Sequence, residues 1–265
     1  MNITIVKVGG AIVEDEAQLR QLIDNFAKIK GPKILVHGGG RRATKIAAQL
    51  GIESHMVGGR RITDADMLDV VTMVYGGLVN KHLVAMLQAK GINAIGLTGA
   101  DMDIIRSHKR PLKRMEIDGK EEMVDFGFVG DVDRADGKAL MQLLKQGAIP
   151  VIAPLTHDGQ GNILNTNADT MAAETACGMA AEGGNVTLIY SFEKRGVLAN
   201  PDDDNSVIPV ITHRSFEEYK ADGTISGGML PKIENALNAI DRGVAKVVIT
   251  LATAIDGNSG TVITE

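Results

Sequence analysis

Two short apolar segments, each followed at once by a glycine cluster, constrain the fold of this chain more than any other feature. The first covers residues 3–10 (Ile-Thr-Ile-Val-Lys-Val-Gly-Gly) and the second covers residues 34–40 (Ile-Leu-Val-His-Gly-Gly-Gly), with a helical pattern directly after it. Glycine allows a sharp turn and leaves backbone N–H groups uncovered, so each cluster can bind an anion. A helix N-terminus behind the second cluster adds partial positive charge. Together with Lys7, the clusters predict a phosphate group that is held from several sides.

Strand and helix patterns alternate along nearly the whole chain. Strand patterns cover residues 3–8, 34–36, 93–97, 148–153, 186–190, 246–251 and 260–264. Helical patterns cover residues 16–30, 43–50, 63–90, 138–145, 168–181 and 232–242, and residues 101–131 are interpreted as hairpins. This order predicts an α/β fold with a mostly parallel sheet covered by helices. Ligands collect at the carboxyl edge of such a sheet, and both glycine clusters belong to that edge.

Length and composition favour one globular unit in the cytoplasm. The 265 residues suffice for one large α/β domain, in which a boundary near residue 180 separates two lobes of one sheet. No segment approaches the roughly 20 consecutive apolar residues of a membrane span. The first residues lack the basic region of a secretory signal, and the lone Cys177 excludes an internal disulfide framework.

The charge of the chain argues against a nucleic-acid partner. The formal net charge is −5, aromatic residues make up 3%, and tryptophan is absent, whereas nucleic-acid-binding domains usually show a basic face or aromatic stacking platforms. One locally basic stretch, residues 106–114, is interpreted as a solvated hairpin arm. The six histidines show no spacing typical of a metal site, so no histidine or cysteine metal site is predicted.

Two lysines are candidates for a phosphate site, because neither common glycine-rich nucleotide motif occurs. Lys7 lies two residues before Gly9 near the end of the first strand, where its ammonium group can neutralise a phosphate oxygen. Lys232 follows a third glycine turn and lies near the start of a helix, where a cation is electrostatically disfavoured. That unfavourable placement indicates that Lys232 has an interaction partner outside its own helix. Taken singly, either lysine can also be explained as an ordinary surface residue.

Two further segments combine polar side chains with a turn. Asn165–Thr170 opens a helix and offers three side chains of the capping type where one would suffice. Asp169 in this segment falls in the first helical turn, where it can receive an ammonium group or a bound Mg²⁺. Arg61 follows a glycine pair and can bind a carboxylate through two parallel hydrogen bonds. A helix cap and an exposed basic residue are the corresponding structural alternatives.

Five motifs together resemble the acetylglutamate kinase branch of the amino acid kinase family. They are residues 7–10 (Lys-Val-Gly-Gly), 36–40 (Val-His-Gly-Gly-Gly), 59–63 (Gly-Arg-Arg-Ile-Thr), 165–169 (Asn-Thr-Asn-Ala-Asp) and 227–232 (Gly-Gly-Met-Leu-Pro-Lys). Residues 127–131 also resemble the hairpin region of these enzymes. The motifs follow the family order over essentially the whole chain, and their combination is specific although each alone is weak. The resemblance implies a three-layer αβα sandwich, ATP and Mg²⁺, and a homodimer. The dimer is expected because ring-forming members carry an additional N-terminal helix, whereas this sequence begins almost at its first strand.

The resemblance also implies roles for the residues named above. Lys7 and Lys232 would contact the transferring phosphoryl group, and Asp169 would hold both lysines in place. Oxygen atoms of the phosphate and the substrate would accept hydrogen bonds from the backbone N–H groups of Gly9, Gly10, Gly39 and Gly40. Arg61 and Asn165 would hold the α-carboxylate of an N-acyl-L-glutamate. The N-terminal lobe, roughly residues 1–180, would bind this acid, and the C-terminal lobe, roughly residues 181–265, would bind ATP.

The implied reaction is ATP-dependent phosphorylation of the γ-carboxylate of an N-acyl-L-glutamate in arginine biosynthesis. This carboxylate is already an anion at pH 7, so the reaction needs no general base. It needs positioning and charge stabilisation, which two lysines, Mg²⁺ and two clusters of backbone N–H groups provide. The acyl group stays open between acetyl and succinyl, because the two acids share the glutamate contacts and differ at one wall of the pocket.

One departure from the family pattern leaves alternatives open. After the strand at 186–190 the family usually has Ser/Thr-Asp, whereas this chain has Ser191-Phe192, followed by Glu193. An apolar ring cannot replace a carboxylate, so the ATP end is expected to be altered, with Glu193 as a possible compensation. The alternatives are a non-catalytic sensor of small molecules with the same fold, and a sister kinase that acts on carbamate or a nucleoside monophosphate.

Overall fold

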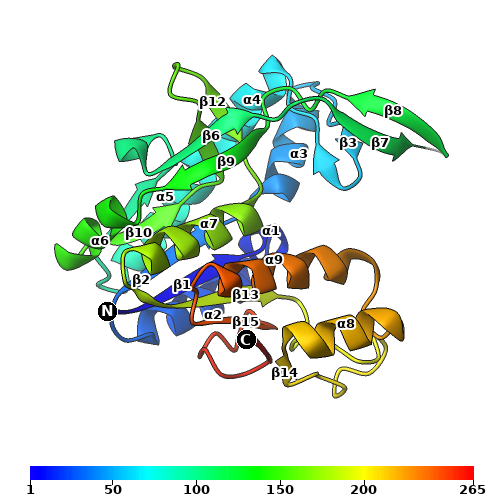
Figure 1. Cartoon of the computed structure of the whole chain (residues 1–265). Coiled ribbons are helices and arrows are strands. Elements are labelled where there is room, and N and C mark those ends of the chain that lie inside the picture. The colour runs from blue at the N-terminus through cyan, green and yellow to red at the C-terminus, as the bar shows by residue number, and fades with distance from the viewer. Residues whose placement is uncertain (118) are drawn as a thin grey trace.

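The first strand shows how the sequence builds the layers of the molecule. In β1 (Asn2–Val8), Ile3 and Ile5 join one hydrophobic cluster, whereas Val6 and Val8 join a second cluster on the opposite face. Successive side chains of a strand point to opposite faces, so a strand covered on both faces is apolar at nearly every position. The computed structural model, which describes residues 1–117 and 119–265, accordingly has a central sheet between two layers of helices (Figure 1). The predicted three-layer α/β fold is confirmed.

Within the described residues, the central sheet has eight strands in the order β14-β16-β15-β13-β1-β2-β10-β5. The other strands of this sheet are β2 (Lys33–His37), β5 (Ala94–Leu97), β10 (Ile149–Ile152), β13 (Asn185–Phe192), β14 (Val210–Ile211), β15 (Lys246–Leu251) and β16 (Thr261–Ile263). Neighbouring strands from β15 to β5 pair in parallel, and β16 pairs antiparallel with β15. The carboxyl ends of the parallel strands therefore meet at one edge, and both glycine clusters leave the sheet there.

Each helical layer covers one face of this sheet. One layer consists of α1 (Gly10–Glu14), α2 (Glu16–Lys28), α3 (Gly40–Gln49), α4 (Ala65–Val71) and α5 (Asn80–Gln88). The other consists of α6 (Gly137–Lys145), α7 (Ala168–Ala181), α8 (His213–Ala221) and α9 (Leu230–Asp241). Two short 3₁₀ segments are η2 (Asp101–Asp103) and η3 (Gly227–Met229). The face covered by α7 and α9 is the face to which Ile3 and Ile5 point.

The helix predicted at residues 63–90 is observed as α4, the π-helical segment η1 (Thr72–Val79) and α5 in direct succession. The glycine pair at 76–77 lies in the π-helical segment, where the wider turn accommodates it. Ala65–Gln88 is long and apolar enough to cross a membrane, with a mean hydropathy of 1.4, although 44% of that window is buried inside the fold. Polar residues interrupt its apolar run, so the sequence alone shows no continuous apolar span there. Val70, Val74 and Leu83 of this segment belong to the hydrophobic cluster on one face of the central sheet.

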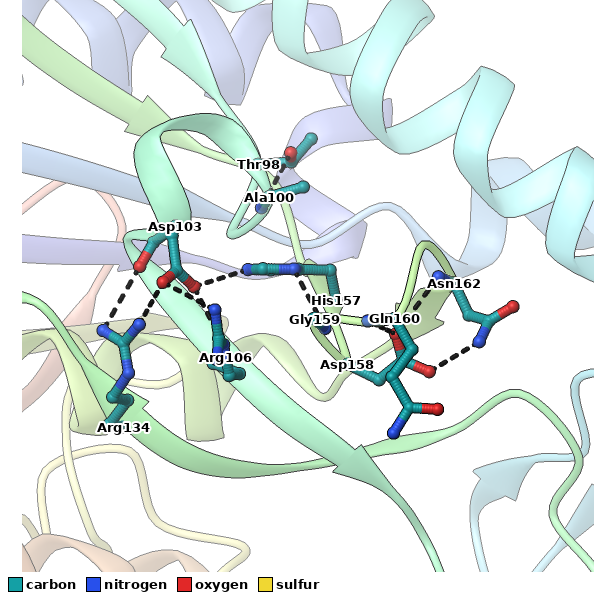
Figure 2. A network of polar contacts seen from close by, with 10 residues as sticks. All are labelled: Thr98, Ala100, Asp103, Arg106, Arg134, His157, Asp158, Gly159, Gln160 and Asn162. Atoms are coloured by element: carbon teal, nitrogen blue, oxygen red, sulfur yellow. Dashed lines mark hydrogen bonds and ion pairs between the residues drawn. The ribbon is translucent and has the colours of Figure 1, made fainter.

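A smaller sheet lies beside the central one. It has the order β12-β11-β6-β9, with β6 (Ile105–Lys109), β9 (Gly130–Ala135), β11 (Leu155–His157) and β12 (Ile163–Asn165). Figure 2 shows three side chains from this sheet, Arg106, Arg134 and His157, turned toward the carboxylate of Asp103 in η2. His157 Nε2 lies 2.7 Å and Arg106 Nη2 lies 2.9 Å from Asp103 oxygens. This carboxylate therefore links three strands of the smaller sheet.

The basic stretch 106–114 was predicted as a solvated hairpin arm, and the strands at its two ends each pair antiparallel with a strand that returns along the chain. Residues 106–109 belong to β6 in the smaller sheet, and only the end of the stretch enters the ribbon of β7 (Lys113–Ile117) and β8 (Lys120–Val124). This ribbon projects from the molecule (Figure 1). Asp118 in the predicted hairpin region lies outside the described residues. Acidic partners neutralise the stretch in the pairs Arg106–Asp103, Lys109–Asp125, Arg110–Asp131 and Arg114–Glu121.

Candidate active site

Lys7 and Asp169 form an ion pair at the carboxyl edge of the central sheet. Strand alternation places the Lys7 side chain on the face of Ile5, which α7 covers, and Asp169 is the second residue of α7. Lys7 Nζ lies 2.6 Å from Asp169 Oδ1, and the two side chains are 9% and 23% exposed. Tyr190, the register partner of Lys7 on β13, donates its hydroxyl to the backbone oxygen of Asp169 at 3.2 Å. Burial raises the pKa of Tyr190, so this hydroxyl stays protonated.

The start of α7 shows which residue of the polar segment is the helix cap. The side chain of Asn167 accepts hydrogen bonds from the backbone nitrogens of Asp169, at 2.8 Å, and Thr170, at 3.1 Å. Asn165 is 9% exposed and donates its side-chain amide to Thr63 Oγ1 at 3.0 Å. One residue therefore caps the helix, and the carboxylate of Asp169 is free to pair with a lysine.

Lys232 lies in the first turn of α9 and shares a cavity of about 460 Å³ with Lys7 and Asp169. Burial lowers the pKa of Lys232, attraction by Asp169 opposes this shift, and repulsion by Lys7 adds to it. Among the described residues Lys232 forms no ion pair, and its Nζ lies 4.1 Å from the centroid of the Phe192 ring. The structure thus brings both predicted lysines together, with Asp169 in contact with only one of them.

The two glycine clusters meet beside these lysines. A Cβ atom added at Gly10 would lie 3.6 Å from the backbone nitrogens of both Gly39 and Gly40, and one at Gly38 would lie 3.2 Å from Gly10 N. Gly9 and Gly39 precede α1 and α3 without a side-chain cap, so the first N–H groups of α3 remain available to an anion. The predicted convergence of two sets of backbone N–H groups therefore agrees with the geometry.

A second cavity of about 230 Å³ adjoins the first, and Gly10 and Gly40 line both. Arg61 and Asn165 line the second cavity. Arg61 donates hydrogen bonds to Gly40 O at 3.0 Å, to Thr44 Oγ1 at 2.9 Å and to the hydroxyl of Ser54. Its guanidinium is therefore fixed by neighbouring residues at the wall of the cavity, with only part of its donors left for a ligand.

Two residues that support the glycine turn were missed or given a minor place by sequence reasoning. Tyr75 of η1 packs so closely that a Cβ at Gly39 would lie 2.8 Å from its ring, which explains the need for glycine there. His37 is fully buried, with Nδ1 2.8 Å from Gly38 O and Nε2 3.1 Å from the Asn80 side-chain nitrogen. Burial lowers the pKa of His37 to about 4, so a neutral imidazole supports the turn. Contacts across such distant residues leave no local pattern in the sequence.

Comparison with known proteins relates the whole chain to one family. Residues 2–251 match the model of the amino acid kinase family. An acetylglutamate kinase from Bacteroides thetaiotaomicron is 63% identical over 259 residues, which are 98% of this chain and 97% of that protein. An acetylglutamate kinase from Methanopyrus kandleri is 38% identical and covers 98% of this chain and 99% of its own length.

Solved structures show the same fold. The crystal structure of smu.665 from Streptococcus mutans has a TM-score of 0.73 and 26% identity, and covers 99% of this chain and 98% of that one. An N-acetylglutamate synthase from Neisseria gonorrhoeae, complexed with coenzyme A and N-acetyl-glutamate, has a TM-score of 0.76 and 21% identity. The match covers all of this chain and 59% of the synthase chain. At 21% identity the similarity concerns the fold alone.

The buried His37 is expected to make stability depend on pH. Its pKa is about 4 in the folded protein and 6.5 in its ordinary state, so the unfolded chain binds a proton first as pH falls. The free energy of unfolding should therefore decrease between about pH 6.5 and 4, by about 3 kcal/mol from this group. Urea unfolding at several pH values measures the slope. His37→Asn should flatten it, whereas the core truncation Val36→Ala should lower stability and keep the slope. An equal slope in His37→Asn and the unmodified protein would contradict this assignment.

Proposed function

Since this chain belongs to the amino acid kinase family, we propose that it transfers the γ-phosphoryl group of ATP to the γ-carboxylate of N-acetyl-L-glutamate, in arginine biosynthesis. The relatives named acetylglutamate kinase support this substrate, with identities from 63% down to 38% over nearly their full length. The observation that carries the proposal is the junction of two cavities at Gly10 and Gly40, with Lys7 and Lys232 beside it. The use of ATP supports a cytoplasmic location.

The lining residues support a division of labour between the cavities. Every residue that lines the smaller cavity lies between Gly10 and Ala168, and Arg61 offers a cation for a carboxylate there. The larger cavity is lined by residues near Lys7 and Gly40 and by residues from Asp169 to Ile249. We assign the acylated acid to the smaller cavity and ATP to the larger one, to which both lobes proposed to divide near residue 180 contribute.

The two substrates would then meet where positive charge is concentrated. Both the γ-carboxylate and the γ-phosphate are anions, so their approach requires charge stabilisation more than proton transfer. Lys7 and Lys232 would stabilise the transferring group from one side, and backbone N–H groups at Gly10 and Gly40 would do so from the other. Asp169 would keep the Lys7 ammonium in place between turnovers. Donors fixed before the reaction stabilise the transition state without a cost of reorganisation.

Mg²⁺ would enter this site together with ATP. Among residues 1–117 and 119–265, no three His, Cys, Asp or Glu side chains are grouped as a metal site. The two carboxylates that line the larger cavity are engaged with cations, Asp169 with Lys7 and Glu193 with Arg41 at 3.7 Å. Mg²⁺ is commonly bound through substrate phosphates, water and one or two carboxylates rather than by a dedicated protein cage. Each of these two ion pairs engages one carboxylate oxygen, so the second oxygens of Asp169 and Glu193 fit a metal of that kind, which would supply further neutralisation of the phosphates.

Turnover with defined acids tests the proposal. The purified protein with ATP and Mg²⁺ should form ADP and a hydroxylamine-reactive acyl phosphate from N-acetyl-L-glutamate. N-succinyl-L-glutamate is measured in parallel, because it differs only in the acyl group. Carbamate and nucleoside monophosphates test the sister-kinase alternative. Calorimetric binding of an acylated acid without ADP formation from any of these acceptors would contradict the proposal and favour a sensor.

Each lysine should be required for the rate, and Lys7 should in addition contribute to stability because it pairs with the poorly exposed Asp169. Lys7→Ala and Lys232→Ala are each expected to lower kcat by about 100-fold or more, because each removes a charge that stabilises the transition state. Lys220→Ala is the control, since Lys220 pairs with Glu234 on the helical surface outside both cavities. Thermal unfolding of each variant verifies the fold. Rates near that of the unmodified protein in both cavity variants would remove these lysines from the reaction centre.

We propose that a second copy of the chain covers the outer face of the helix α4-η1-α5. Met73 and Leu78 on this face are 56% and 48% exposed, so both large apolar side chains are available to pack against another chain. Sedimentation should give twice the chain mass of 28.1 kDa. Leu78→Glu should shift the equilibrium toward the monomer, whereas Leu112→Glu, at a residue that is 60% exposed before β7, should leave it unchanged. A monomer in the unmodified protein would refute the homodimer.

A further inference from the structure

The proposed reaction assigns no role to Phe192, although this residue lines the cavity in which the reaction would occur. It is the last residue of β13 and points to the same face of the sheet as Tyr190, whose ring centroid is 6.2 Å away. Lys7 on β1 points to this face as well, because Tyr190 is its register partner. Phe192 is half-buried and lines the larger cavity together with both lysines. An aromatic ring thus lies among the groups that would bind the transferring phosphoryl.

Both ammonium groups lie over this ring. Lys232 Nζ is 4.1 Å and Lys7 Nζ is 5.5 Å from the ring centroid of Phe192. These distances are within the range of about 6 Å in which the negative face of a ring attracts a cation. Lys7 also has its ion pair with Asp169, so the ring is a secondary partner there.

Lys232 depends on the ring much more than Lys7 does. In the described part of the chain its ammonium group forms neither an ion pair nor a hydrogen bond. The first turn of α9 disfavours a cation, and burial disfavours it further. The ring of Phe192 is thus the contact that the described residues give the ammonium of Lys232, and the carboxylates of Asp169 and Glu193 attract it without forming an ion pair.

We propose that Phe192 is a positioning residue that holds the Lys232 ammonium over its ring, aimed at the phosphoryl group in the cavity. This inference rests on the proposed kinase function. The aspartate that the family usually carries at this position would hold Lys232 by opposite charge, whereas this chain offers an uncharged ring. The ring attracts the ammonium through its quadrupole and adds no net charge, so the lysine keeps its full charge for the substrate.

The contact itself can be measured without any reaction. In protein labelled with ¹³C-lysine, the ε-methylene protons of Lys232 should show an upfield ring-current shift, and Lys232→Arg identifies the signal by its disappearance. Phe192→Leu keeps an apolar side chain without a π face and should abolish the shift. An unshifted Lys232 signal in the unmodified protein would overturn the proposal, whether or not the protein proves to be a kinase.

The effect on the rate is tested with fluorinated rings at position 192. Mono-, di- and trifluorophenylalanine preserve nearly the size of the ring and progressively weaken its negative face. The value of kcat should fall stepwise along this series, by about 3-fold to 30-fold at the trifluoro ring, with the KM for the acylated acid nearly unchanged. Phe192→Trp should retain most of the rate, because tryptophan has the strongest face for a cation. A kcat that does not respond to fluorination would overturn the proposal, since packing alone then accounts for the ring.

A matched control separates this role from general effects of fluorination. Phe216 on α8 has Lys220 Nζ 5.9 Å from its ring centroid but lies outside both cavities. Trifluorophenylalanine at this position should leave kcat unchanged. Turnover by the unmodified protein is measured first, so that a failure of the proposed function is seen there, before any variant is compared.

Discussion

The ion pair between Lys7 and Asp169 is the contact on which the rest of the site depends. It joins the end of β1, in the middle of the sheet, to the first turn of α7 at a distance of 2.6 Å. With the side chains only 9% and 23% exposed, either partner left alone would retain a poorly solvated charge, which is strongly destabilising. The pair therefore fixes α7 at the carboxyl edge of the sheet, next to the glycine turns. A polyanion that enters the cavity meets an ammonium group already in place.

Much of this arrangement could be predicted from the sequence, because each segment follows rules that can be read from a few neighbouring residues. Period-two alternation sets the face to which Lys7 points, and parallel pairing brings the ends of β1, β2 and β13 to one edge. The side-chain caps of Asn167 and the proline in the first turn of α9 fix where two helices begin. Each is a property of a few neighbouring residues. Their sum was enough to bring Lys7, Asp169 and Lys232 into one cavity.

What could not be predicted depends on contacts between segments far apart in the chain. Helix α8 was missed because His213–Ala221 buries only Phe216 and so lacks a clear apolar period. The expectation that Asp169 holds both lysines followed from the family resemblance; the structure shows an ion pair of Asp169 with Lys7, and Lys232 lies against the ring of Phe192. Glu193, considered as a substitute for the missing carboxylate, pairs with Arg41 on the rim at 3.7 Å. The residue that departs from the family pattern is thus the one that Lys232 contacts.

The charge of the cavity contrasts with that of the whole chain. The formal net charge is −5, yet the larger cavity is lined by four cationic side chains, Lys7, Arg41, Lys194 and Lys232, against two anionic ones, Asp169 and Glu193. A positive cavity in an acidic protein draws anions to one place and away from the rest of the surface. Among the described residues, Lys232 is the one of these four cations without an ion pair, so a phosphate oxygen that binds there displaces no anionic partner. The uncharged ring of Phe192 beneath it leaves that ammonium group to the substrate.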